Sequence, residues 1–112
     1  MKKLLWLLAF LCFASASQAQ FADQRQYAPS SGGTANAQTV AVSNYALNVG
    51  VVIRFKASNT NTGAMTLNVN GTGVKALDKQ TTSGLTALTG NEVYAGQIVQ
   101  VIYDGTLYEL IQ

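Results

Sequence analysis

Side chains that commonly perform catalysis are scarce in this sequence. It contains no histidine, and Cys12 is its one cysteine. Histidine is the usual general base and the usual activator of a serine or cysteine nucleophile, and histidine and cysteine are the main soft metal ligands. The carboxylates are therefore the principal reactive groups left to consider.

These carboxylates are dispersed along the chain, at Asp23, Asp78, Glu92, Asp104 and Glu109. A glycosidase needs two carboxyl groups facing each other across a cleft, and Asp78 with Glu92 is the pair that two loops could bring together. A chain of this length offers little room for a substrate cleft. Calcium-loop and phosphate-loop spacings are also missing. We therefore predict a protein that is not an enzyme and that has no metal site and no cofactor.

Amide, hydroxyl and aromatic side chains gather instead in segments predicted to be loops. The candidates for a binding site are Asn59, Thr60, Asn61 and Thr62 in a central loop, with Tyr45 and Tyr94 in two other loops. Amides and hydroxyls can hydrogen-bond a sugar while an aromatic ring stacks on it, so this composition permits a glycan site. The alternative is that Asn, Thr and Gly build turns and that the tyrosines pack at the rim of the core.

The first 19 residues are typical of a secretory signal peptide. Lys2 and Lys3 precede an apolar run over residues 4–16, and Ser17 and Ala19 supply small side chains before a cleavage point. The apolar run is shorter than the roughly 20 residues that a membrane-spanning helix requires. We expect cleavage after Ala19, export to the periplasm or the cell exterior, and no stable membrane span after cleavage.

Removal of the signal peptide would leave 93 of the 112 residues, with no cysteine and with equal numbers of basic and acidic side chains. A neutral chain without a basic cluster releases few counterions from a phosphate backbone, so no nucleic-acid partner is expected. The length predicts one domain with a marginal hydrophobic core. Assembly into a homotrimer or a larger complex would relieve that marginality.

The segment 20–37 is polar and small, with Pro29 followed by two serines and two glycines. It shows no apolar periodicity, so we predict a flexible polar leader ahead of a β-domain over residues 38–112.

Alternating apolar and polar residues predict short strands in the β-domain. In the clearest example, Ile53, Phe55 and Ala57 point one way while Arg54 and Lys56 point the other. The expected strands are residues 39–43, 51–57, 65–70, 74–79, 98–103 and 106–111. Residues 80–90 are expected to form a loop whose leucines, Leu85 and Leu88, plug the core. The predicted fold class is all-β, a small antiparallel β-sandwich or barrel of five to six short strands after an N-terminal signal helix.

Asp104 and Gly105 predict a two-residue type I′ hairpin turn near the end of the chain. This turn would place Tyr103 opposite Thr106 and Val101 opposite Tyr108. The second face of the hairpin carries Ile98 and Ile111 at its ends, which favours a face that is covered or that contacts another subunit.

Two stretches carry a recognisable order of motifs. Residues 54–73 read RFKASNTNTGAMTLNVNGTG, with Lys75 shortly after them, and residues 95–110 read AGQIVQVIYDGTLYEL. The NTGA-T-LNVNG strand–turn unit, the AGQ tripeptide and the closing YDGT hairpin resemble a small β-domain, often in tandem copies, of bacteriophage tail fibres and related receptor-binding tail proteins. The similarity covers about residues 34–112, nearly the whole chain after the signal peptide.

The resemblance implies a β-rich virion appendage domain that acts as a scaffold or as a host-surface adhesion element, generally within elongated trimeric fibres. It supplies no catalytic and no binding residues. Our hypothesis is a non-enzymatic, exported structural or adhesion domain at a virion or cell surface, with a cell-surface glycan or protein as partner. The alternative is a secreted, lectin-like carbohydrate-binding protein. A secretion signal ahead of one module is unusual for a tail fibre, so phage and bacterial origin both stay open.

Overall fold

The structure, a computed structural model, describes residues 26–112. The predicted signal peptide over residues 1–19 and the start of the predicted leader lie outside the described residues. The described part contains nine strands, about 45% of its residues, and no helix. The strands are β1 (Tyr27–Ala28), β2 (Gly32–Gly33), β3 (Ala37–Val40), β4 (Val52–Lys56), β5 (Met65–Val69), β6 (Val74–Thr81), β7 (Gly84–Ala87), β8 (Ile98–Tyr103) and β9 (Tyr108–Leu110).

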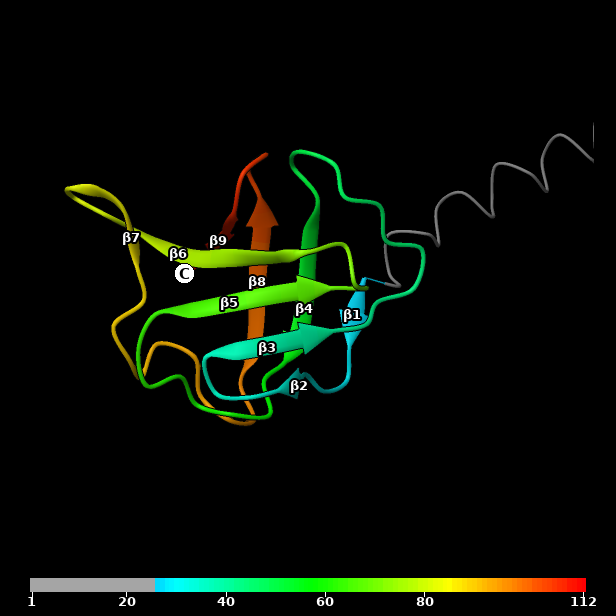
Figure 1. Ribbon diagram of the computed structural model, residues 1–112, viewed down its shortest axis with the longest axis horizontal. Helices are drawn as coiled ribbons and strands as arrows, with labels where there is room; N and C mark the ends of the chain where they lie inside the picture. Colours follow the sequence, from blue (N-terminus) through cyan, green and yellow to red (C-terminus); the bar gives the residue numbers. More distant parts are fainter. Residues whose placement is uncertain (1–25) are drawn as a thin grey trace, which may run out of the picture.

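These strands form one curled, mixed sheet that resembles half of a barrel. The strand order is β1-β4-β8-β9-β6-β5-β3-β2, with β7 paired to β6 alone. Figure 1 shows β3, β5 and β6 crossing in front of β4 and β8 at a steep angle, so the curl brings two halves of the sheet face to face. The all-β class is confirmed.

The expected strand count and the purely antiparallel pairing are wrong. Three pairings are parallel: β1 with β4, β3 with β5, and β6 with β9. Each joins strands that are not linked by a hairpin, and local turn signals carry no information about such pairs.

The core is built from the inward-facing residues of the alternating strands. Ile53 and Phe55 of β4 and Leu67 and Val69 of β5 are all fully buried, as the sequence pattern predicts. The fully or nearly fully buried apolar residues are Ala28, Val40, Val42, Ile53, Phe55, Ala57, Met65, Leu67, Val69, Leu77, Leu88, Val93, Val99, Val101, Tyr103, Tyr108 and Leu110.

Residues 80–90 are not the loop that we expected. Strand β6 continues to Thr81, turns at Thr82 and Ser83, and returns as β7. Leu88 is buried at the edge of the core, whereas Leu85 is 39% exposed, so only one of the two leucines plugs the core. The turn carries neither an Asn-Gly nor an Asp-Gly dipeptide, which is why the hairpin signal was missed.

The described part of the predicted leader, residues 26–37, belongs to the sheet, so our expectation of a flexible segment over residues 20–37 is wrong for these residues. Strand β1 runs parallel to β4, with Ala28 opposite Phe55, and β2 pairs with β3. Between them, the backbone N–H of Ser31 donates to the carbonyl of Lys56 at 2.9 Å. Because one short segment pairs with both ends of the sheet, residues 27–33 close the half-barrel (Figure 1). We call them the closing segment.

A buried polar network lies beneath the closing segment. Gln38 is 1% exposed, and its Oε1 accepts a hydrogen bond from the Ser31 hydroxyl at 2.7 Å. Its Nε2 donates to the carbonyls of Ala35 and Asn59 at 3.2 and 3.1 Å. Because the amide has partners on both sides, it can be buried at little cost and it fixes the position of the closing segment.

The C-terminal hairpin has a longer turn than expected. Tyr103 pairs with Tyr108 and Val101 with Leu110, so residues 104–107 form the turn. Asp104 Oδ1 accepts hydrogen bonds from the backbone N–H groups of Leu107 and Thr106 at 2.9 and 2.8 Å, and these donors lower the pKa of Asp104. The register differs from the prediction by two residues, which preserves the inward and outward faces.

Candidate functional site

Two loops cross-linked by hydrogen bonds form the candidate site. Residues 57–64 follow β4 and residues 88–97 precede β8, and they run side by side along the lower margin of the molecule in Figure 1. Backbone N–H groups of Ala57, Asn61 and Gly96 donate to the carbonyls of Gln97, Val93 and Ala57 at 2.9, 3.1 and 2.7 Å. We call these two loops the loop platform.

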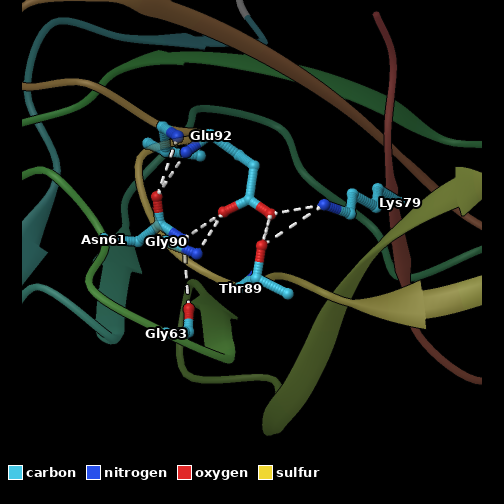
Figure 2. Close-up of polar contacts among 7 residues, drawn as sticks. Asn61, Gly63, Lys79, Thr89, Gly90 and Glu92 are labelled. Atoms are coloured by element: carbon cyan, nitrogen blue, oxygen red, sulfur yellow. Dashed lines mark hydrogen bonds and ion pairs between the residues drawn. The ribbon is translucent and has the colours of Figure 1, made fainter.

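The side chain of Asn61 joins the two loops of the platform by hydrogen bonds. Its side chain is completely buried, and its Oδ1 accepts from the backbone N–H groups of Glu92 and Val93 at 3.0 and 2.9 Å. Its Nδ2 donates to the carbonyl of Gly63 at 3.0 Å and to Glu92 Oε1 at 2.9 Å (Figure 2). The structure therefore places this candidate inside the molecule, where its amide joins the two loops.

Glu92 is the second residue that holds the platform together. Its carboxylate accepts hydrogen bonds from Lys79 Nζ at 2.7 Å and from the backbone N–H groups of Thr89 and Gly90 at 2.7 and 2.6 Å (Figure 2). Its side chain is 12% exposed. Burial by itself would raise the pKa of Glu92, but the bonds from Lys79, Thr89, Asn61 and Gly90 outweigh burial and hold the pKa well below its usual range.

The two threonines of the central loop also stabilise the platform. Thr60 Oγ1 accepts from the backbone N–H of Ala95 at 3.0 Å. Thr62 exchanges two hydrogen bonds of 2.9 Å with the side chain of Asn36, which ties the platform to the segment just before β3. Asn59 is half-buried, and it contributes its carbonyl to Gln38.

The two candidate tyrosines lie at opposite ends of the molecule. Tyr94 is on the loop platform and is 54% exposed. Tyr45 packs against the far end of the core, where its hydroxyl lies 2.5 Å from the hydroxyl of Tyr108. Burial of the Tyr45 hydroxyl is the largest cause that raises the pKa of Tyr45. The hydrogen bond with Tyr108 and the charge of Tyr108 raise it further. Tyr45 is thus a core-rim residue that cannot share a site with residues 59–62 and Tyr94.

Sequence reasoning did not identify Glu92, Lys79 and Asn36 as framework residues. One signal for Glu92 was present. Thr89 precedes it by three residues, the spacing of a capping box, and the structure shows Thr89 Oγ1 and N both bonded to Glu92 Oε2. For Lys79 and Asn36 no local pattern exists, because their partners lie 13 and 26 residues away.

We expect Glu92 to make the stability of the domain pH-dependent. Its folded pKa lies below its unfolded value of about 4.5, so its stabilising contribution is fully present above that value and is lost as the pH falls further. Glu92→Gln should cost about 1–3 kcal/mol at pH 7, because the new amide N–H group faces donors. Urea unfolding of both proteins from pH 7 to pH 3 should show the difference shrinking below pH 4.5. A difference that stays constant would contradict this role.

No protein-family model matches the sequence, and no curated protein matches it significantly. Within residues 26–112 there is no helix long and apolar enough to cross a membrane. The same residues contain no group of three or more His, Cys, Asp or Glu side chains placed to hold a metal ion.

Proposed function

We propose that this protein is a non-enzymatic, exported structural or adhesion domain that acts at a virion or cell surface, and that the loop platform is its contact surface. The observation that carries the proposal is the combination of a hydrogen-bonded loop framework with an exposed aromatic ring on it, that of Tyr94. Tyrosine is enriched where proteins bind partners, because its ring is large and rigid and ends in a polar group.

The framework supports this role because it reduces the entropy cost of binding. Tyr94 is held at both backbone groups, since its N–H donates to Gln97 Oε1 at 2.8 Å and its carbonyl accepts from the Gln97 N–H at 3.0 Å. Thr60 bonds to the next residue, Ala95, at 3.0 Å. A partner would therefore meet a surface whose loops are already ordered.

The resemblance to phage tail fibre domains supports the same proposal from the sequence. The residues that carry it, 54–73, form β4, the first loop of the platform, β5 and the turn after it. The second motif begins at Ala95 and Gln97, in the other platform loop. Export rests on the signal-peptide pattern of residues 1–19.

A second candidate function is carbohydrate binding, and one further observation favours it. A shallow groove of about 370 Å³ crosses β2, β3 and the end of β5. Its lining is largely apolar, with Val40, Ala41 and two glycines, and Ser30, Thr39 and Asn68 add hydroxyl and amide groups. Such groups suit the hydrogen-bonding pattern of a sugar.

Binding of the labelled protein to bacterial cells tests the proposed contact surface. Tyr94→Ala should weaken binding about tenfold or more, because an exposed aromatic anchor at a contact commonly contributes over 1.4 kcal/mol. Tyr27→Ala is the matched control, since Tyr27 is a 42% exposed tyrosine on β1, opposite Arg54 of β4 and outside the two platform loops. It should bind as the unchanged protein does.

Two results would count against the platform as the contact surface. One is equal binding by the Tyr94→Ala and unchanged proteins, and the other is equal loss in the Tyr94→Ala and Tyr27→Ala proteins. Competition by free oligosaccharides would favour the carbohydrate-binding candidate, and a glycan array would then identify the sugar. Competition by soluble surface protein alone would favour adhesion to a protein.

A further inference from the structure

The outward side of β4, β8 and β9, with the adjoining part of β6, carries a half-exposed aliphatic surface. Ile98 is 53% exposed and Ile111 is 40% exposed, and Val52 and Ile102 between them are partly exposed. Cross-strand pairing joins Val52 to Ile102 and Lys56 to Ile98. We call this surface the outer face.

Charges on the outer face are sorted by strand. Arg54 and Lys56 lie on β4, whereas Glu109 lies on β9 and Asp78 pairs with it on β6. The outward residues of β8, which runs between the two groups, are Ile98, Gln100 and Ile102, and none is charged. The surface is thus basic on one side, aliphatic in the middle and acidic on the other side.

Within the described part of the chain, Arg54, Lys56, Glu109 and Asp78 form no ion pairs with one another. The ion pair found in residues 26–112 is Lys79 with Glu92, at the loop platform. On the acidic side, a hydrogen bond that the protonated Glu109 carboxyl donates to Asp104, partial burial, and then the negative charges of Asp104 and Asp78 raise the pKa of Glu109. A cation brought close to Glu109 would relieve this repulsion.

We propose that two copies of this chain pack together through their outer faces, about a two-fold axis parallel to β8. The charge pattern selects this axis. A two-fold axis along β8 places β4 of one copy over β9 and β6 of the other, so that basic meets acidic twice. An axis perpendicular to the strands would place β4 over β4 and bring like charges together.

The registers of the strands fit this arrangement. Arg54 lies in the row of Gln100, and Glu109 lies in the adjacent outward row, that of Ile102 and Val52. The two therefore lie about 7 Å apart along the strands and about 10 Å apart between the sheets, a separation that an arginine and a glutamate side chain can span together. Aligned packing of two sheets about 10 Å apart also covers Ile98, Ile102 and Ile111, which a monomer leaves in water.

Sedimentation velocity of the purified protein over a range of concentrations tests the proposal. We expect a dimer, and Arg54→Glu should weaken it at least about tenfold, because two favourable contacts become repulsive by symmetry. Glu109→Arg should weaken it similarly. The double variant Arg54→Glu with Glu109→Arg restores opposite charges and should regain most of the affinity. Both side chains point outward, so each variant should keep the unfolding transition of the unchanged protein at concentrations where both are monomeric.

The loop platform provides the control, since Tyr94→Ala should leave the dimer intact. A monomer at all concentrations, or a trimer, would overturn the proposal. So would a dimer that is insensitive to Arg54→Glu, or a double variant as weak as the two single variants.

Discussion

Replacing Ala28 with glutamate should destabilise the domain by about 3–5 kcal/mol, because the substitution places a carboxyl group in the core without a partner. Ala28 is 1% exposed and pairs with the position of Phe55 on β4, so its methyl group lies among core residues. Urea unfolding followed by circular dichroism would measure the change. The result tests whether the closing segment is part of the folded domain.

Tyr27→Glu is the matched control for this substitution. Tyr27 precedes Ala28 on the same two-residue strand but points outward and is 42% exposed. The same new side chain should therefore change stability by less than about 1 kcal/mol. Equal stabilities of the two variants would mean that the closing segment is not packed as the structure shows.

Asn61→Ala should destabilise the domain by about 3–4 kcal/mol, the second large effect that we expect. The substitution removes the acceptor for the N–H groups of Glu92 and Val93, and it removes a donor to the Glu92 carboxylate. Each buried group left without a partner costs about 1–3 kcal/mol. Thermal unfolding would show a lower midpoint, and Tyr94 fluorescence, compared with a Tyr94→Phe variant, would report loosening of the loop platform.

Asn59→Ala provides the comparison within the same loop. The contribution of Asn59 to the structure is its backbone carbonyl, which accepts from Gln38 and is kept in the variant. We expect a loss below about 1 kcal/mol. If Asn59→Ala proved as costly as Asn61→Ala, the hydrogen bonds of Asn61 would not explain the effect.

Local patterns predicted the strands that build the core. The alternation in residues 51–57 and 65–70 placed Ile53, Phe55, Leu67 and Val69 correctly inside. In the final hairpin the inward face was also right although the register was not, because a shift of two residues returns each side chain to the same face. The turn length was wrong because Asp104 accepts two backbone N–H groups and thereby stabilises a longer turn.

The candidate site shows the limit of the same reasoning. Residues 59–62 and Tyr94 were selected as polar or aromatic loop residues, and the structure brings them together on one platform. Their roles differ, however, because Asn61 is buried while Tyr94 is exposed. Composition cannot separate a ligand-binding amide from a structural one, since both residues have the same hydrogen-bonding groups.

The sequence by itself determined that this protein is an all-β domain, which strand faces turn inward, and which loops carry polar groups, because these properties follow from residue order within a few positions. Only the tertiary structure decided that residues 27–33 close the half-barrel, that Asn61, Glu92 and Lys79 bind two loops together, and that basic and acidic strands share one outer face. Each of these features joins residues far apart in the chain. Their proximity depends on the curl and strand order of the whole sheet, which no local pattern encodes.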